Sequence, residues 1–215
     1  MPIKIFNWCQ LIINYILTLF LLVLDRLLLS KMVPNYQNEN NIDLEHKFFK
    51  SIAPDTFDRL PSLNVLSLKK NSLSALDQNL FKDLKNLNRL FLSGNNLSSL
   101  PSNIFESLTN LIYLDLGTNQ LTSLKSDTFK KLTNLKSLLL VENKLITLDV
   151  NIFKSLTNLM VLSLVKNNLI SIDQNIFRGL VNLNKVYLAG NPISKDNSSY
   201  TKQLCSTNPK CEIII

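Results

Sequence analysis

The sequence is poor in the residues that build most catalytic and cofactor sites. Among 215 residues there are one histidine, three cysteines and four glycines. With His46 alone there is no histidine pair for a metal ion, and the cysteines lack the spacing of a zinc site. The glycines stand too far apart to form a phosphate-binding loop. We therefore expect no enzyme activity, no cofactor and no bound metal.

The chain is rich in leucine, which recurs within a single 24-residue pattern. The spacing L-x-x-L-x-L-x-x-N-x-L-x-x-L-x-x-x-x-F-x-x-L is clearest from Leu63 to Leu84. A fixed period of this length is typical of solenoids, in which each repeat stacks on the next. The L-x-L part alternates with period two, which predicts a strand with one buried face. Successive strands would run parallel and be joined by right-handed crossovers.

One asparagine per repeat stands where the predicted strand ends and the chain turns. Its amide both donates and accepts hydrogen bonds, so it can serve main-chain groups of its own turn and of the adjacent one. A buried main-chain group left unpaired costs about 1–3 kcal/mol. We therefore expect a structural ladder made by Asn71, Asn95, Asn119, Asn143, Asn167 and Asn191.

The pattern resembles the typical 24-residue subfamily of leucine-rich repeats, found in Toll-like receptors, Slit proteins, variable lymphocyte receptors and small leucine-rich proteoglycans. The resemblance implies an α/β repeat fold: a right-handed horseshoe solenoid with a parallel concave β-sheet and short irregular or helical convex segments. It is strong over residues 63–193. Residues 42–62 read as a degenerate N-terminal capping repeat, with Lys47 in the place of the asparagine. The resemblance does not define a ligand.

The first 31 residues are predicted to be a signal peptide or an uncleaved signal anchor. Lys4 precedes an apolar stretch over residues 5–24, long enough to attach the chain to a membrane. Ser30 is the best candidate for a cleavage site. A buried helix that packs on the open end of the solenoid is the alternative. Residues 32–41 are mostly polar and predict a linker.

Residues 194–215 resemble a reduced form of the C-terminal cap of extracellular leucine-rich repeat proteins. Asn191-Pro192 matches the start of that cap, but only Cys205 and Cys211 follow, where the family has four cysteines. A disulfide between these two and a pair of free thiols both fit the sequence. The family's N-terminal cysteine cap is missing. Asn96 and Asn197 lie in sequons and are candidate glycosylation sites in a secreted protein.

The outward-facing residues of the predicted strands form the expected partner-binding surface. They alternate with buried leucines and would make a nearly continuous apolar stripe with a basic rim. Such a patch marks a binding site more often than not, although β-propensity alone also places valines on strands. The candidate contact residues are Arg89, Phe91, Tyr113, Asp115, Leu139, Val141, Val161, Val165, Lys185 and Tyr187.

The sequence as a whole predicts a non-enzymatic recognition protein, secreted or membrane-anchored, whose concave sheet binds a protein partner. The net charge of +7 comes from basic residues scattered over both faces, so we expect no nucleic-acid partner. An intracellular scaffold or adapter is the alternative. The missing N-terminal cysteine cap favours the alternative, whereas Lys4 and the apolar start favour secretion or anchoring.

Overall fold

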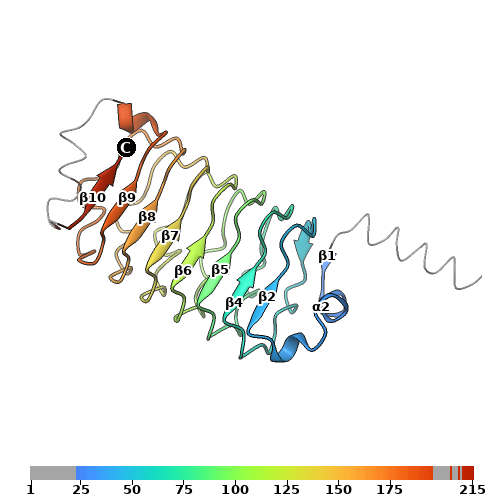
Figure 1. Cartoon of the computed structure of the whole chain (residues 1–215). Helices are drawn as coiled ribbons and strands as arrows, with labels where there is room; N and C mark the ends of the chain where they lie inside the picture. Colours follow the sequence, from blue (N-terminus) through green and yellow to red (C-terminus); the bar gives the residue numbers. More distant parts are fainter. Residues whose placement is uncertain (1–22, 196–203, 205–207, 209) are drawn as a thin grey trace, which may run out of the picture.

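The computed structural model describes residues 23–195, 204, 208 and 210–215 (Figure 1). Eight short parallel strands form one sheet in the order β10-β9-β8-β7-β6-β5-β4-β2. This order follows the chain, so each repeat stacks on the preceding one and the molecule is an elongated solenoid (Figure 1). The predicted solenoid with a parallel sheet is confirmed. The strands are β2 (Asn41–Asp43), β4 (Val65–Ser67), β5 (Arg89–Phe91), β6 (Tyr113–Asp115), β7 (Ser137–Leu139), β8 (Val161–Ser163), β9 (Lys185–Tyr187) and β10 (Glu212–Ile214).

The core of the solenoid is a stack of leucine and phenylalanine layers. The central residue of each repeat strand pairs in register with its equivalent, as Leu66 does with Leu90 and Leu90 with Leu114, and all three are fully buried. Behind the sheet, phenylalanines of neighbouring repeats stack with ring centroids 6.2–6.5 Å apart in four pairs along the row from Phe57 to Phe177. Within the described residues, the segments opposite the sheet are turns rather than helices.

The turn after each strand passes through the left-handed backbone region. The residue before the ladder asparagine has positive φ in every repeat, and so does His46 in the first one. Only two of these residues are glycines, and Thr118, for example, has φ 48°. A left-handed residue other than glycine costs about 1–2 kcal/mol, so the hydrogen bonds of the following asparagine must hold these turns in place.

The N-terminal end of the solenoid is covered by a folded segment. Strand β1 (Val23–Leu24) pairs in parallel with β3 (Ser51–Ile52) in a separate two-stranded sheet. Helix α2 (Arg26–Met32) follows, and the Asp25 side chain caps it by accepting a hydrogen bond from the Leu28 N–H at 2.7 Å. The 3₁₀ helix η1 (Tyr36–Asn38) completes the segment.

This segment differs from the predicted signal segment and linker. Leu24 and Leu29 are fully buried and Tyr36 is 5% exposed, so all three belong to the solenoid core. The linker expected at residues 32–41 is instead folded, because Met32 ends α2, Tyr36 packs inward and β2 begins at Asn41. The rest of the predicted leader, residues 1–22, lies outside the described residues. No helix in the described part of the chain is long and apolar enough to cross a membrane.

The C-terminal end adds a strand that the repeat pattern does not predict. After the 3₁₀ helix η2 (Pro192–Lys195), Leu204 and Asn208 are buried, and β10 pairs in parallel with β9. Asn208 donates hydrogen bonds from Nδ2 to the main-chain oxygens of Leu180 and Leu183. Cys211 is disulfide-bonded. Its expected partner Cys205 and the sequon residue Asn197 lie outside the described residues.

Candidate binding surface

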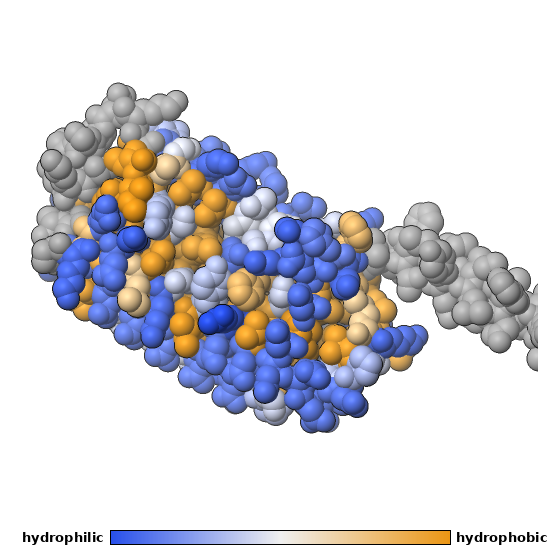
Figure 2. Space-filling view, in the orientation of Figure 1, coloured by the Kyte–Doolittle hydropathy of each residue, from blue (hydrophilic) through white to orange (hydrophobic). Residues whose placement is uncertain are grey.

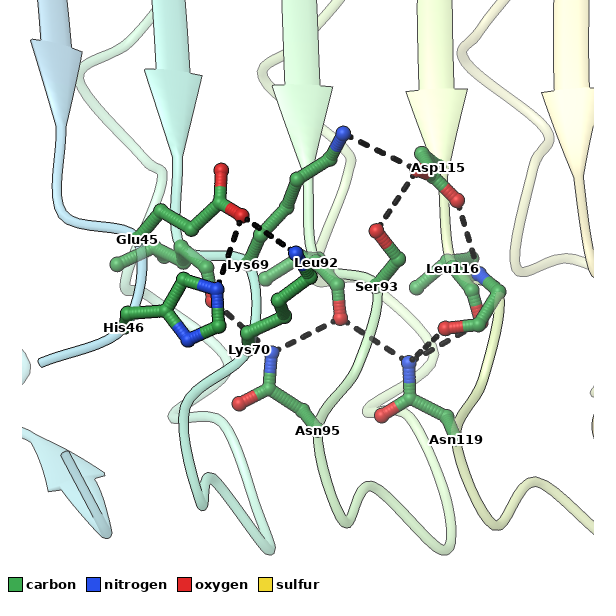
Figure 3. Close-up of polar contacts among 12 residues, drawn as sticks. Glu45, His46, Lys69, Lys70, Leu92, Ser93, Asn95, Asp115, Leu116 and Asn119 are labelled. Atoms are coloured by element: carbon green, nitrogen blue, oxygen red, sulfur yellow. Dashed lines mark hydrogen bonds and ion pairs between the residues drawn. The ribbon is translucent and has the colours of Figure 1, made fainter. Parts of the chain in front are cut away.

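The ladder asparagines connect each repeat to the one before it. Asn119 donates from Nδ2 to the main-chain oxygens of Leu92, Leu116 and Gly117 at 3.0–3.1 Å, and its Oδ1 accepts from the Leu97 N–H at 3.1 Å. Equivalent contacts recur at the other five asparagines, all of which are buried. Figure 3 shows two of them, Asn95 and Asn119, side by side. They fix the spacing of the strand ends, so the surface in front of them is formed before a partner binds.

A second row of asparagines holds the edge where the strands begin. Each donates from Nδ2 to a main-chain oxygen 25 residues earlier, at 2.8–3.0 Å. The sequence-based expectations did not include this row, although an asparagine stands one residue before the first leucine of every repeat from Leu87 onward. Its members are Asn86, Asn110, Asn134, Asn158 and Asn182.

The sheet face carries all ten predicted contact residues on five neighbouring strands or directly after them. The two basic residues, Arg89 and Lys185, are exposed. The apolar and aromatic residues are half-buried: their inner edges pack on neighbours while their outer edges contact solvent. In Figure 2 apolar surface is most extensive toward the β8–β9 end of this face, and polar surface covers much of the β2–β4 end. The face therefore combines an apolar region with a charged one.

Aromatic and basic side chains meet on β5 and β6. The rings of Phe91 and Tyr113 lie with centroids 5.1 Å apart and tilted by 44°. The Lys69 ammonium stands 4.6 Å from the centroid of the Phe91 ring, which is a cation–π contact. Because each side chain is held by a neighbour from another repeat, the cluster presents a fixed shape to a ligand.

Asp115 has a different role from the other candidates. It is only 8% exposed, so it offers little surface to a partner. Its carboxylate accepts hydrogen bonds from the Ser93 hydroxyl at 2.8 Å and the Gly117 N–H at 3.0 Å, and the Lys69 ammonium lies 3.9 Å away (Figure 3). Asp115 therefore positions Lys69 and Ser93 instead of facing the solvent as predicted.

The environment of Tyr113 keeps its phenol protonated. Burial raises the pKa of Tyr113 above its ordinary value, the negative charge of Asp115 raises it further, and the positive charge of Arg89 lowers it in part. The neutral hydroxyl can therefore donate a hydrogen bond to a ligand across the physiological range.

Ion pairs line the edge where the strands end. Lys70 pairs with Glu45 at 3.1 Å, and Lys166 pairs with Glu142 at 2.6 Å. The hydrogen bonds from Lys166 and Thr118 lower the pKa of Glu142. These exposed pairs contribute little to stability. Arg89 and Lys185 on the sheet, in contrast, have no acidic partner within the described residues.

The fold is a solenoid of stacked repeats with one continuous parallel sheet. The chain matches the leucine-rich repeat family over residues 40–97, 85–145 and 133–193, which is more than half of its length. The chain therefore belongs to the leucine-rich repeat family, and the resemblance seen in the sequence is confirmed. A search of curated proteins found no match.

Solved structures of a Toll-like receptor and of Toll are similar to this chain. The structure of a TLR13–ssRNA13 complex matches with a TM-score of 0.73 and 33% identity, covering 81% of this chain and 24% of that one. The Drosophila Toll–Spatzle complex matches with a TM-score of 0.59 and 28% identity, covering 70% of this chain and 24% of that one. The chain thus spans about a quarter of each matched chain. The likeness supports a protein-interaction module.

Proposed function

We propose that this chain is a non-enzymatic recognition module, secreted or membrane-anchored, that binds a protein partner across the sheet face of β5 to β9. The observation that carries the proposal is the half-exposed row of apolar and aromatic side chains on a backbone fixed by two asparagine rows. Aromatic anchors held in place dominate many protein interfaces. Because the face is formed in advance, binding orders few groups and loses little affinity to entropy.

The size and charge of the face also suit a protein. Strands lie about 4.8 Å apart, so the seven repeat strands span ~30 Å and the five strands of the proposed face span ~20 Å of that length. The whole sheet is therefore large enough for a standard interface of roughly 800 Å² per partner centred on these five strands. Arg89 and Lys185 are exposed at opposite ends of the apolar row and lack acidic partners among the described residues. The partner would therefore present an apolar centre flanked by carboxylates. The neighbouring Toll structure, solved in complex with Spatzle, supports an extracellular location.

The proposal is tested by alanine variants of two aromatic residues on the face. Phe91→Ala and Tyr187→Ala should each weaken binding to a protein partner found in a screen of extracellular proteins, and leave the melting temperature nearly unchanged. Val150→Ala, in the turns behind the sheet, is the matched control and should bind normally. Folded Phe91→Ala and Tyr187→Ala variants that both bind as tightly as the wild type would show that the face is wrongly assigned.

Single-stranded RNA is a second candidate ligand, favoured by the TLR13–ssRNA13 neighbour. Because that neighbour was solved with single-stranded RNA, the scattered basic charge of this chain is not sufficient to exclude a nucleic-acid partner. On this chain the rings of Phe91, Tyr113 and Tyr187 could stack on bases while Lys69 and Arg89 contact phosphates. Binding of an RNA oligonucleotide that weakens steeply with salt would support this candidate. Absence of binding at low salt would reject it.

A further inference from the structure

A hollow lined by asparagines lies at the edge where β2, β4 and β5 begin. Its volume is about 440 Å³, which is within the usual range of roughly 300–1,000 Å³ for small-molecule sites. Every residue that lines it is uncharged, although the chain carries a net charge of +7. Five of these residues are asparagines: Asn40, Asn64, Asn86, Asn88 and Asn110.

Three of these asparagines stand at a repeat position where other residue types also occur. Asn40, Asn64 and Asn88 each stand directly before a strand, one repeat apart, and face the same hollow. In the following three repeats the equivalent position holds Ile112, Lys136 and Met160. Asn86 and Asn110, in contrast, belong to the structural row that recurs in later repeats. The next repeat again has asparagine at this position, Asn184, so the particular feature of this end of the sheet is that three such asparagines stand in consecutive repeats and line one hollow.

Hydrogen bonds within the hollow orient its amides and leave acceptors unused. Asn88 donates from Nδ2 to Asn64 Oδ1 at 2.9 Å, and Asn86 and Asn110 donate to main-chain oxygens. The Oδ1 atoms of Asn86, Asn88 and Asn110 receive no hydrogen bond from any residue that the structure describes. The Asn40 side-chain amide likewise makes none within those residues, whereas its main-chain oxygen accepts hydrogen bonds from the N–H groups of Asn64 and Val65. The hollow thus offers several fixed acceptors and one free amide that can both donate and accept.

We propose that this hollow binds a neutral carbohydrate through the sugar hydroxyls. Adjacent hydroxyl groups of a sugar both donate and accept hydrogen bonds. An asparagine side chain can match both, because its oxygen accepts and its NH₂ group donates. The absence of charged residues in the lining disfavours an ionic ligand, and the positive net charge of the chain disfavours a cation. The site lies beside Val65 and Arg89 on the sheet face, but the proposal does not depend on a protein partner there.

Saturation-transfer NMR with glucose, galactose, mannose and N-acetylglucosamine tests the proposal. At least one sugar should receive saturation from the wild-type protein, and its affinity should fall roughly tenfold in the Asn64→Ala/Asn88→Ala double variant, which loses two or more neutral hydrogen bonds. Asn184→Ala is the matched control, since Asn184 occupies the same repeat position before β9 and should bind as wild type. No transfer to any sugar, or equal transfer in the double variant, would overturn the proposal.

A titration of the wild-type protein makes the test independent of how the variants fold. The side-chain amide resonances of Asn64 and Asn88 should shift with added sugar, while those of Asn134 and Asn158 in the structural row should stay in place. Shifts confined to Asn134 and Asn158 would contradict the site. The titration is repeated with arginine whose amino and carboxyl termini are blocked, so that only the guanidinium group is charged. If the Asn64 and Asn88 resonances shift with this compound but with none of the four sugars, the hollow binds a guanidinium group and the proposal is overturned.

Discussion

Asn119 donates a hydrogen bond from its Nδ2 to the main-chain oxygen of Leu92, 3.0 Å away and 27 residues earlier in the chain. The same amide serves Leu116 in its own repeat and Leu97 in the preceding one. One buried side chain therefore joins two turns, and its equivalents do so along the solenoid. This relationship makes the sheet face a rigid surface.

Replacing this amide should destabilise the fold strongly. Asn119→Leu leaves several buried main-chain groups without partners, so the free energy of unfolding should fall by about 2–3 kcal/mol. Gln120→Leu is the control, because Gln120 is exposed and its main-chain hydrogen bond does not involve the side chain. Chemical denaturation of both variants measures the difference. Equal midpoints would contradict the ladder account.

Removing one buried hydroxyl group should instead stabilise the fold. Thr128 is 3% exposed, and its Oγ1 has no hydrogen-bond partner among the residues that the structure describes. Thr128→Val removes that orphan group and should raise the free energy of unfolding by about 1 kcal/mol. Thr56 occupies the same repeat position, but its hydroxyl donates to Ala53 at 2.7 Å, so Thr56→Val should destabilise instead. Stability changes of the same sign in the two variants would show that hydrogen bonding is not the cause.

The N-terminal segment should contribute measurably to stability. A chain that begins at residue 33 lacks Leu24 and Leu29, both fully buried, and should lose about 3–6 kcal/mol of burial. A chain that begins at residue 23 keeps both leucines and is the reference for the comparison. Equal thermal stability of the two truncated chains would contradict this role.

The ionisation of Tyr113 provides a test of the charge arrangement on the face. Its pKa is higher in the folded chain than the ordinary tyrosine value of about 10. The protonated phenol therefore stabilises the fold below the unfolded pKa, and this contribution is lost as pH rises through the folded pKa. The phenolate absorbance of the wild type is followed as pH rises, and that of the Tyr113→Phe variant is subtracted. The difference gives the midpoint of Tyr113 ionisation. Asp115→Asn should lower it and Arg89→Ala should raise it. A midpoint at or below the ordinary value would reject the arrangement.

Periodicity explains which parts of this structure could be predicted from the sequence. Leu66 and Phe81 recur at fixed spacing, so the strand faces and the stacked core followed directly from the pattern. Residues 23–38 occur once, and the apolar side chains around Leu27 looked like an extension of the preceding hydrophobic run. Asp115 was placed correctly on the sheet face. Its burial depends on Ser93 and Lys69 from other repeats, which a pattern within one repeat does not reveal.

The most direct test of binding through the sheet face is photo-crosslinking from single positions. A photoreactive phenylalanine analogue replaces Val161 on β8 in one protein and Val150 in the turns behind the sheet in the other. Both proteins are exposed to the partner identified by screening. We expect covalent capture from position 161 and little from position 150. Capture from position 150 with none from position 161 would contradict the account.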